Sequence, residues 1–76
     1  MNSETTPQLL KEVHHGKNIK RFREMFGIKQ DILAELLEVS QQTVSRYESQ
    51  EELEDEVLSK CAKALHINIT LILSTK

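Results

Sequence analysis

Side chains able to bind nucleic acid are concentrated in one short stretch of the sequence. Gln41 and Gln42 stand side by side, and a glutamine amide can donate to adenine N7 while it accepts from the adenine N6 amino group. Hydroxyl side chains nearby suit phosphate oxygens, which fix the position of a protein on DNA without reading sequence. These hydroxyls belong to Ser40, Thr43 and Ser49.

The element expected to carry these groups is a helix from Gln41 to about Ser49. Ser40 precedes it as a good N-cap, because a serine hydroxyl can accept from a backbone N–H of the first turn. Val44 and Tyr47 fall on the inward face of this helix. The residues left toward solvent are Gln41, Gln42, Ser45 and Arg46, and an ordinary solvated helix face is the alternative interpretation of these four.

A preceding helix is expected to begin near Gln30 and to bury Leu33, Ala34 and Leu37. The turn between the two helices is Glu38-Val39-Ser40. Two short helices joined in this way form a helix-turn-helix, whose second helix enters the major groove of DNA. Gln30 can place both its amide and its backbone N–H on a phosphate, because it lies at a helix N-terminus.

Apolar spacing predicts further helices on both sides of this pair. Ile19, Phe22 and Phe26 form one stripe, which Gly27 ends as the residue after the helix. A polar connection from 50 to 55 leads to a fourth helix, where Cys61 lies on the apolar stripe and is expected in the core. The tail, 69–73, has the β-branched content of a strand, but it has no second strong strand as a partner, so a short fifth helix is expected.

The composition is that of one small folded domain. The chain has 76 residues, 38% hydrophobic and 29% charged, and its single cysteine excludes an internal disulfide. No apolar run approaches the roughly 18 residues of a membrane span, and the first residues lack the features of a signal peptide. We expect a cytoplasmic, nucleoid-associated protein with no membrane contact, with residues 1–13 a flexible lead-in and 14–76 the domain.

The charge distribution is uneven, although the net charge is only −2. Residues 1–30 hold six basic and three acidic side chains, about +3, whereas residues 31–76 hold four basic and nine acidic ones, about −5. A net negative charge is unusual for a nucleic-acid binder. A basic run in the first part is either a solvated face or a contact to the DNA backbone beside the groove; it comprises Lys17, Lys20 and Arg21.

The run from Gly16 to Leu73 resembles the phage-repressor-like helix-turn-helix family, of the Cro/C1 or XRE type. The resemblance rests on IKRFREMFGIKQDILAELLEVSQQTVSRYE and on the downstream LSKCAKALHINITLIL. It implies an all-α, five-helix, repressor-like domain with the helix-turn-helix at helices two and three. It also implies binding to double-stranded DNA, usually in transcriptional regulation, and commonly a homodimer on a near-palindrome.

The resemblance also gives roles to single residues. It puts Gln30 at the phosphate-binding glutamine, Gln41 and Gln42 at the base-reading start of the recognition helix, and Ser45 at a further base-facing position. In several members an arginine of the first helix pairs with the glutamate that closes the recognition helix. The resemblance puts Arg23 and Glu48 at these two positions, which implies a structural ion pair.

Three departures from the family pattern bear on function. Glu38 occupies a turn position that is often glycine, and a non-glycine residue with positive φ costs roughly 1 kcal/mol. The loop after the recognition helix, often basic in the family, is acidic here. Glu56 lies about where some members send an arginine into the minor groove. These departures predict a weak reader of DNA, or one that needs a dimer.

Two classes of function therefore stay open. One is a sequence-specific DNA-binding regulator; the other is a protein-interaction module or antitoxin-like partner binder, with weak or no DNA affinity, whose acidic loop 51–56 binds a basic protein. Leu71, Ile72 and Leu73 exceed what one short helix is expected to bury, which predicts a dimer seam. We expect no enzymatic activity, cofactor or metal site, because His14-His15 lacks further ligands at a suitable spacing and the acids lack the alternation of a calcium loop.

Overall fold

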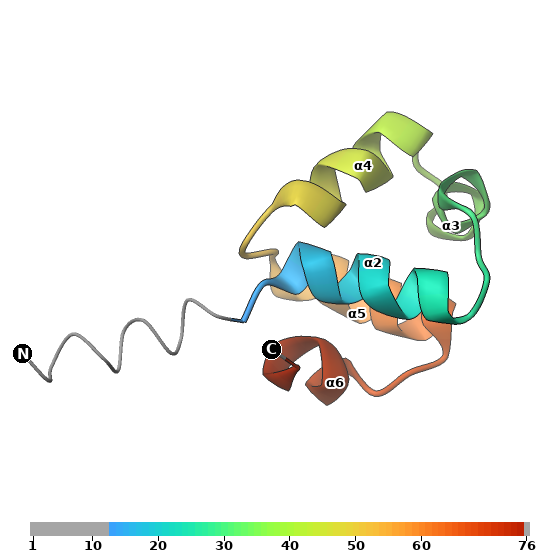
Figure 1. The fold of residues 1–76 in the computed structure, drawn as a ribbon. Coiled ribbons are helices and arrows are strands. Elements are labelled where there is room, and N and C mark those ends of the chain that lie inside the picture. The colour runs from blue at the N-terminus through green and yellow to red at the C-terminus, as the bar shows by residue number, and fades with distance from the viewer. Residues whose placement is uncertain (1–12, 76) are drawn as a thin grey trace, which may run out of the picture.

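Residues 13–75 are described by a computed structural model, and they form five α-helices and no strand (Figure 1). The all-α prediction is confirmed, and the tail forms the expected short helix. Residues 1–12, which make up most of the predicted lead-in, lie outside the described part. The helices are α2 (His15–Met25), α3 (Gln30–Leu37), α4 (Gln41–Ser49), α5 (Asp55–Leu65) and α6 (Ile69–Ser74).

The ends of α2 are fixed by local hydrogen bonds. At the start, His14 is the N-cap, and its Nδ1 accepts from the backbone N–H of Lys17 at 3.0 Å. At the other end Gly27 has φ +71°, and its N–H donates to the Glu24 carbonyl at 3.0 Å. The left-handed backbone of Gly27 confirms its predicted place after the helix, where glycine is favoured because it has no Cβ.

The first turn of α2 lies directly against the C-terminal end of α4. The backbone N–H of His15 donates to the Glu51 carbonyl at 2.9 Å, and that of Gly16 donates to the Gln50 carbonyl at 3.0 Å. A Cβ on Gly16 would lie 2.5 Å from the Glu48 carbonyl oxygen and would also meet the carbonyl of Tyr47. Glycine is therefore required at position 16 by a close approach of two backbones.

Gly16→Ala is expected to lower the free energy of unfolding by about 3 kcal/mol, near the upper end for overpacking, because the obstructing atoms are backbone. Gly27→Ala is the matched control: no packed atom of residues 13–75 lies within 4 Å of its Cβ position, so the strain of positive φ remains, about 1 kcal/mol. Urea denaturation of both variants compares the two losses. A Gly16→Ala protein at least as stable as Gly27→Ala would contradict the close approach.

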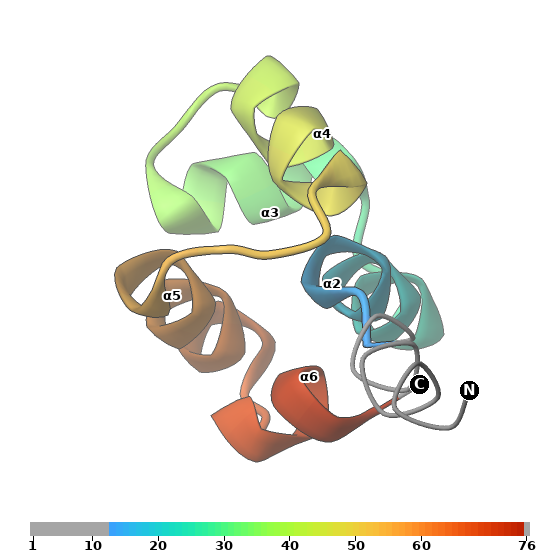
Figure 2. The ribbon, with the colours of Figure 1, turned by 90° about the vertical axis from the view of Figure 1, so that its left-hand side faces the viewer.

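The core is shared by all five helices, which surround it as Figure 2 shows. Ile72 of α6 is fully buried, whereas its neighbours Leu71 and Leu73 are 42% and 43% exposed. The predicted dimer seam at 71–73 is therefore wrong for Ile72, because α6 turns one face onto α2 and α5 and the domain does bury this side chain. Leu53, in the polar connection after α4, is also buried, which the sequence pattern did not indicate.

A buried amide attaches α6 to α2. Asn18 is 2% exposed, and its Nδ2 donates to the carbonyls of Ile72 at 2.8 Å and Thr75 at 2.6 Å. The last carbonyls of a helix have no partner within the helix, so these bonds satisfy groups that burial would otherwise leave unpaired.

Candidate nucleic-acid interface

The turn between α3 and α4 has a left-handed residue at its start. Glu38 has φ 60° and ψ 42°, and the N–H of Val39 donates to the Ala34 carbonyl at 3.0 Å. Glu38 therefore has the positive φ expected at this turn position, which is often glycine in similar sequences. A residue with a Cβ adopts this left-handed conformation at a cost in free energy. The turn connects the end of α3 to the start of α4 (Figure 1).

The N-terminus of α4 is capped as predicted. Ser40 Oγ accepts from the backbone N–H of Thr43 at 3.1 Å and lies 2.9 Å from Thr43 Oγ1. At the far end, Ser49 Oγ donates to the Arg46 carbonyl at 2.8 Å. All three hydroxyls predicted to contact phosphates are therefore also engaged with their own helix, and their oxygens keep lone pairs that can accept.

The two faces of α4 differ in the way the sequence indicated. Val44 is buried and Tyr47 is half-buried, while a polar set faces solvent. Glu48 also lies on the inward face of α4, although it is charged, and it is only 7% exposed. The exposed set is Gln41, Gln42, Ser45, Arg46 and Ser49.

Glu48 is held by Arg23 of α2 in a buried ion pair. Arg23 Nε donates to Glu48 Oε2 at 2.7 Å, and Arg23 Nη2 donates to Oε1 at 3.2 Å. A third guanidinium bond goes from Nη1 to the Ile28 carbonyl at 2.8 Å. The two-point contact fixes both planar groups, so it sets the orientation of α4 relative to α2.

The hydrogen bonds continue from this pair to the start of α4. Gln30 Nε2 donates to Glu48 Oε1 at 3.0 Å, and Gln30 Oε1 accepts from Gln41 Nε2 at 3.2 Å. Because a carboxylate can only accept, Glu48 sets which way the Gln30 amide faces. The chain from Arg23 to Gln41 links three helices, and its two glutamine contacts were not predicted from the sequence.

The basic side chains of α2 lie beside this network. A shallow hollow between α2, α3 and α4 brings Lys17 and Lys20 to the same surface as residues from the other two helices. Both lysines are exposed and lie almost one helical turn apart. The hollow is lined by Lys17, Lys20, Gln30, Ser45, Glu48 and Ser49.

The helix-turn-helix family matches residues 19–72, which contain the whole of α3, α4 and α5 and most of α2 and α6. The chain belongs to the Cro/C1-type helix-turn-helix family. This is a family of DNA-binding regulatory domains and not of enzymes. No curated protein and no solved structure matches the chain significantly. Within residues 13–75, every helix is too short or too polar to cross a bilayer.

The acidic stretch of this Cro/C1-type domain lies past the C-terminal end of α4. All five carboxylates are exposed. Two of them, Asp55 and Glu56, lie in the first turn of α5, where negative charge interacts favourably with the helix dipole, and Glu56 also pairs with Lys60 at 3.7 Å. Glu54 is the N-cap of the same helix, so its charge also lies at the N-terminal end of the dipole. Glu51 and Glu52 lie before the cap, in the connection from α4.

The adjacent histidines have structural contacts at the start of α2. His14 caps the helix, and His15 Nδ1 accepts from the backbone N–H of Leu53 at 3.0 Å. Among residues 13–75, no three histidine, cysteine or acidic side chains are grouped as metal ligands. Both histidines therefore have a structural role at the start of α2.

Cys61 lies in the core, 1% exposed. Burial, and secondarily the charge of Glu48, raise the pKa of its thiol from 9.0 to about 11. The folded state therefore holds the thiol proton more tightly than the unfolded chain between these pH values. Stability must fall as the pH rises through this window, because unfolding releases the proton.

Cys61→Ala is expected to remove this part of the pH dependence. For pKa values of 9.0 and about 11, raising the pH from 8 to 10 costs the native protein about 1.4 kcal/mol more than it costs the variant. Urea denaturation at both pH values gives the loss of stability of each protein. The titration of the lysines affects both proteins equally, so it drops out of the comparison. Parallel pH profiles for the two proteins would contradict the shifted thiol.

Proposed function

We propose that this protein is a sequence-specific, DNA-binding transcriptional regulator that reads the major groove with α4. The observation that carries the proposal is the hydrogen bond from Gln41 to Gln30, which orients a base-reading amide at the exposed start of α4. Lys17 and Lys20 flank the same surface. The family membership of the chain supports DNA binding in general. The exposed side chains of α4 and the lysines of α2 support the proposal that α4 enters the major groove.

Gln41 is proposed to read an adenine. One hydrogen of its Nε2 is used by Gln30, which leaves the second hydrogen and Oε1 for N7 and the N6 amino group of the base. Gln42, Ser45 and Arg46 lie on the same exposed side and extend the contact to neighbouring positions.

The phosphate contacts are proposed to surround this helix. The N-terminus of α3 offers the backbone N–H of Gln30, and helix N-termini favour anions. Lys17 and Lys20 add positive charge on one flank. The hydroxyls of Ser40, Thr43 and Ser49 complete the set.

A homodimer is proposed to bring two such surfaces onto a near-palindrome, where it acts as a repressor at the nucleoid of the cytoplasm. Leu71 and Leu73 remain exposed on α6 after Ile72 is assigned to the core. Two large apolar side chains on one short helix fit a small isologous contact. A monomeric mass at tens of micromolar would contradict this part of the proposal.

The proposed face can be tested with mixed-sequence duplex DNA at low salt, because non-specific binding uses the same phosphate contacts. We expect amide NMR shifts concentrated at the starts of α3 and α4 and on the Lys17–Lys20 side of α2. The exposed acids at 51–56 favour one alternative, a module for basic proteins. No shift with DNA, together with shifts at 51–56 on adding a polylysine peptide, would overturn the proposal in favour of that module.

Charge reversal in the acidic stretch is expected to strengthen DNA binding. Glu52→Lys removes a repulsive charge from the connection that follows α4 and adds a cation, so the salt dependence of log K should steepen by roughly 0.9 if it forms one phosphate contact. Glu35→Lys makes the same change in charge on an exposed part of α3 and serves as the control. Equal effects of the two variants on affinity and salt slope would contradict a local role of the acids.

A further inference from the structure

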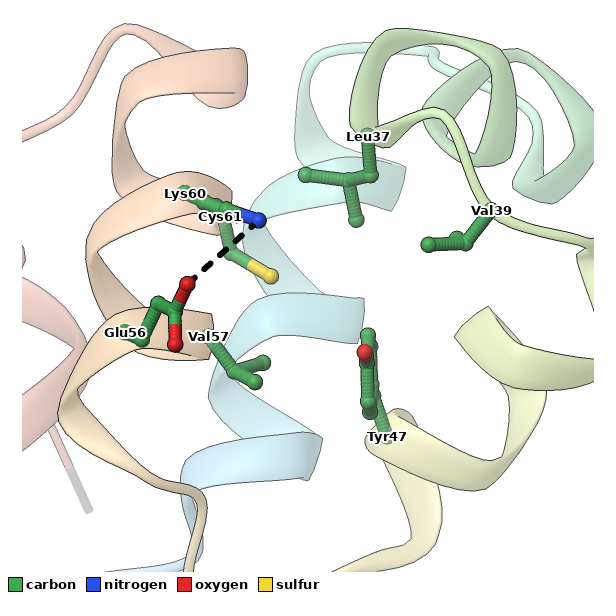
Figure 3. A pocket seen from close by; sticks show the side chains of 7 residues that line it. All are labelled: Leu37, Val39, Tyr47, Glu56, Val57, Lys60 and Cys61. Carbon is green, nitrogen blue, oxygen red and sulfur yellow. Dashed lines mark ion pairs between the residues drawn. The ribbon is translucent and has the colours of Figure 1, made fainter.

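A cavity of about 160 Å³ lies on the side of α4 that faces α5 (Figure 3), and neither Gln41 nor Gln42 is among its lining residues. It is bounded by the end of α3, the turn, the inner face of α4 and the first turns of α5. Figure 3 shows the side chains converging on a common space from these elements. The lining residues are Leu37, Val39, Tyr47, Glu56, Val57, Lys60 and Cys61.

Most of the side chains that line this cavity are apolar. Leu37, Val39 and Val57 are each half-buried against the core, and Cys61 forms a further wall. The Cys61 thiol keeps its proton at neutral pH, so it acts as a small apolar group. An apolar cavity of roughly 150 Å³ is large enough to take up benzene. The volume therefore suits a single six-membered ring.

The polar groups of the cavity are few. The Tyr47 hydroxyl makes no hydrogen bond with any group of residues 13–75. At the edge, Lys60 and Glu56 pair at 3.7 Å, so the rim carries one charge of each sign. A charged ligand would lose its hydration in the apolar interior and find the opposite charge at the rim already paired. One neutral hydrogen-bonding group on the ligand matches the free hydroxyl.

We infer that this cavity binds a small, uncharged aromatic molecule that carries one hydroxyl group, with the ring among Leu37, Val39 and Val57 and the hydroxyl at Tyr47. Such a ligand would contact the turn and α4 on one side and α5 on the other. It would therefore bridge the helix-turn-helix and the rest of the fold. The inference does not depend on the proposed function, because occupancy can be measured without DNA.

Phenol itself is the probe, titrated into the isotope-labelled protein and followed by amide NMR. We expect saturable shifts that are largest at the cavity residues on α5 and in the turn. Val57→Phe fills the cavity and should abolish the saturable shifts, whereas Ile32→Phe adds the same ring at an exposed position on α3 and should leave them unchanged. Shifts in the native protein that grow linearly with phenol and are spread over the surface would overturn the inference, whatever the stability of the variants.

The hydroxyl contact is tested separately with Tyr47→Phe. This variant should weaken phenol binding roughly two- to tenfold, the value of one neutral hydrogen bond, and should leave toluene binding unchanged. Equal affinity of the native protein and Tyr47→Phe for phenol would overturn the placement of the hydroxyl at Tyr47.

Discussion

Glu48→Ala is expected to destabilise the domain by about 3–5 kcal/mol, because it leaves the guanidinium of Arg23 buried without its carboxylate. The Arg23 and Glu48 side chains are only 9% and 4% exposed. The exposed carboxylate of Glu24, 4.0 Å from Arg23 Nη2, does not replace the lost two-point contact. The same change removes the acceptor that orients Gln30. Stability and the geometry of the proposed reading helix should therefore be lost together.

Gln42→Ala is the matched control for this effect, since Gln42 is exposed on the same helix and makes no contact with the pair. Surface substitutions of this kind usually change the free energy of unfolding by less than about 0.5 kcal/mol. Thermal denaturation of both variants measures the difference. Equal midpoints for Glu48→Ala and Gln42→Ala would contradict the structural importance of the ion pair.

Gln41→Ala is expected to weaken binding to a specific site by about 1–3 kcal/mol, or roughly 5- to 150-fold, and to remove the preference for adenine at one position. Its effect on stability should be small, because Gln41 is exposed and, within residues 13–75, its side chain has one hydrogen bond, which goes to Gln30. Gln50→Ala removes the same side-chain type from an exposed position at the other end of α4 and is the control. Equal losses of affinity in the two variants would show that Gln41 reads no base.

The parts of the fold that could be predicted are those determined by neighbours in the sequence. The bounds of α4 follow from the Ser40 cap and the alternation of Val44 and Tyr47 with polar residues, and the structure has the helix at Gln41–Ser49. Gly27 ends α2 for an equally local reason, the need for positive φ. Such signals act within one or two helical turns, and sequence spacing displays them directly.

The features that were missed depend on contacts between distant residues. Asn18 appears as a polar residue on a basic helix, and only the arrival of α6, 54 residues later, gives its amide acceptors. The sequence predicts Ile72 at a dimer seam, whereas it is buried in the domain, because spacing cannot show which face of a short helix another helix will cover. Leu53 is surrounded by acids in the sequence, yet it is buried beside the bond from its own N–H to His15.

The candidate site divides in the same way. The exposed glutamines and serines of α4 were evident from residue type and helical spacing, as was the basic character of α2. Their assembly was not, because the bonds from Glu48 through Gln30 to Gln41 join residues 18 and 11 positions apart. A glutamine amide carries no local signal of its direction, so only the packed structure gives it one.

Selection of duplexes from a random-sequence pool at low salt tests the central claim most directly, because it reports binding, motif and half-site spacing together. We predict an enriched, inverted pair of half-sites about one helical turn apart, or a multiple of it, each with an adenine whose enrichment is lost in Gln41→Ala. No enrichment over the starting pool, or the same motif from the native protein and from Gln41→Ala, would contradict the reading of DNA by α4.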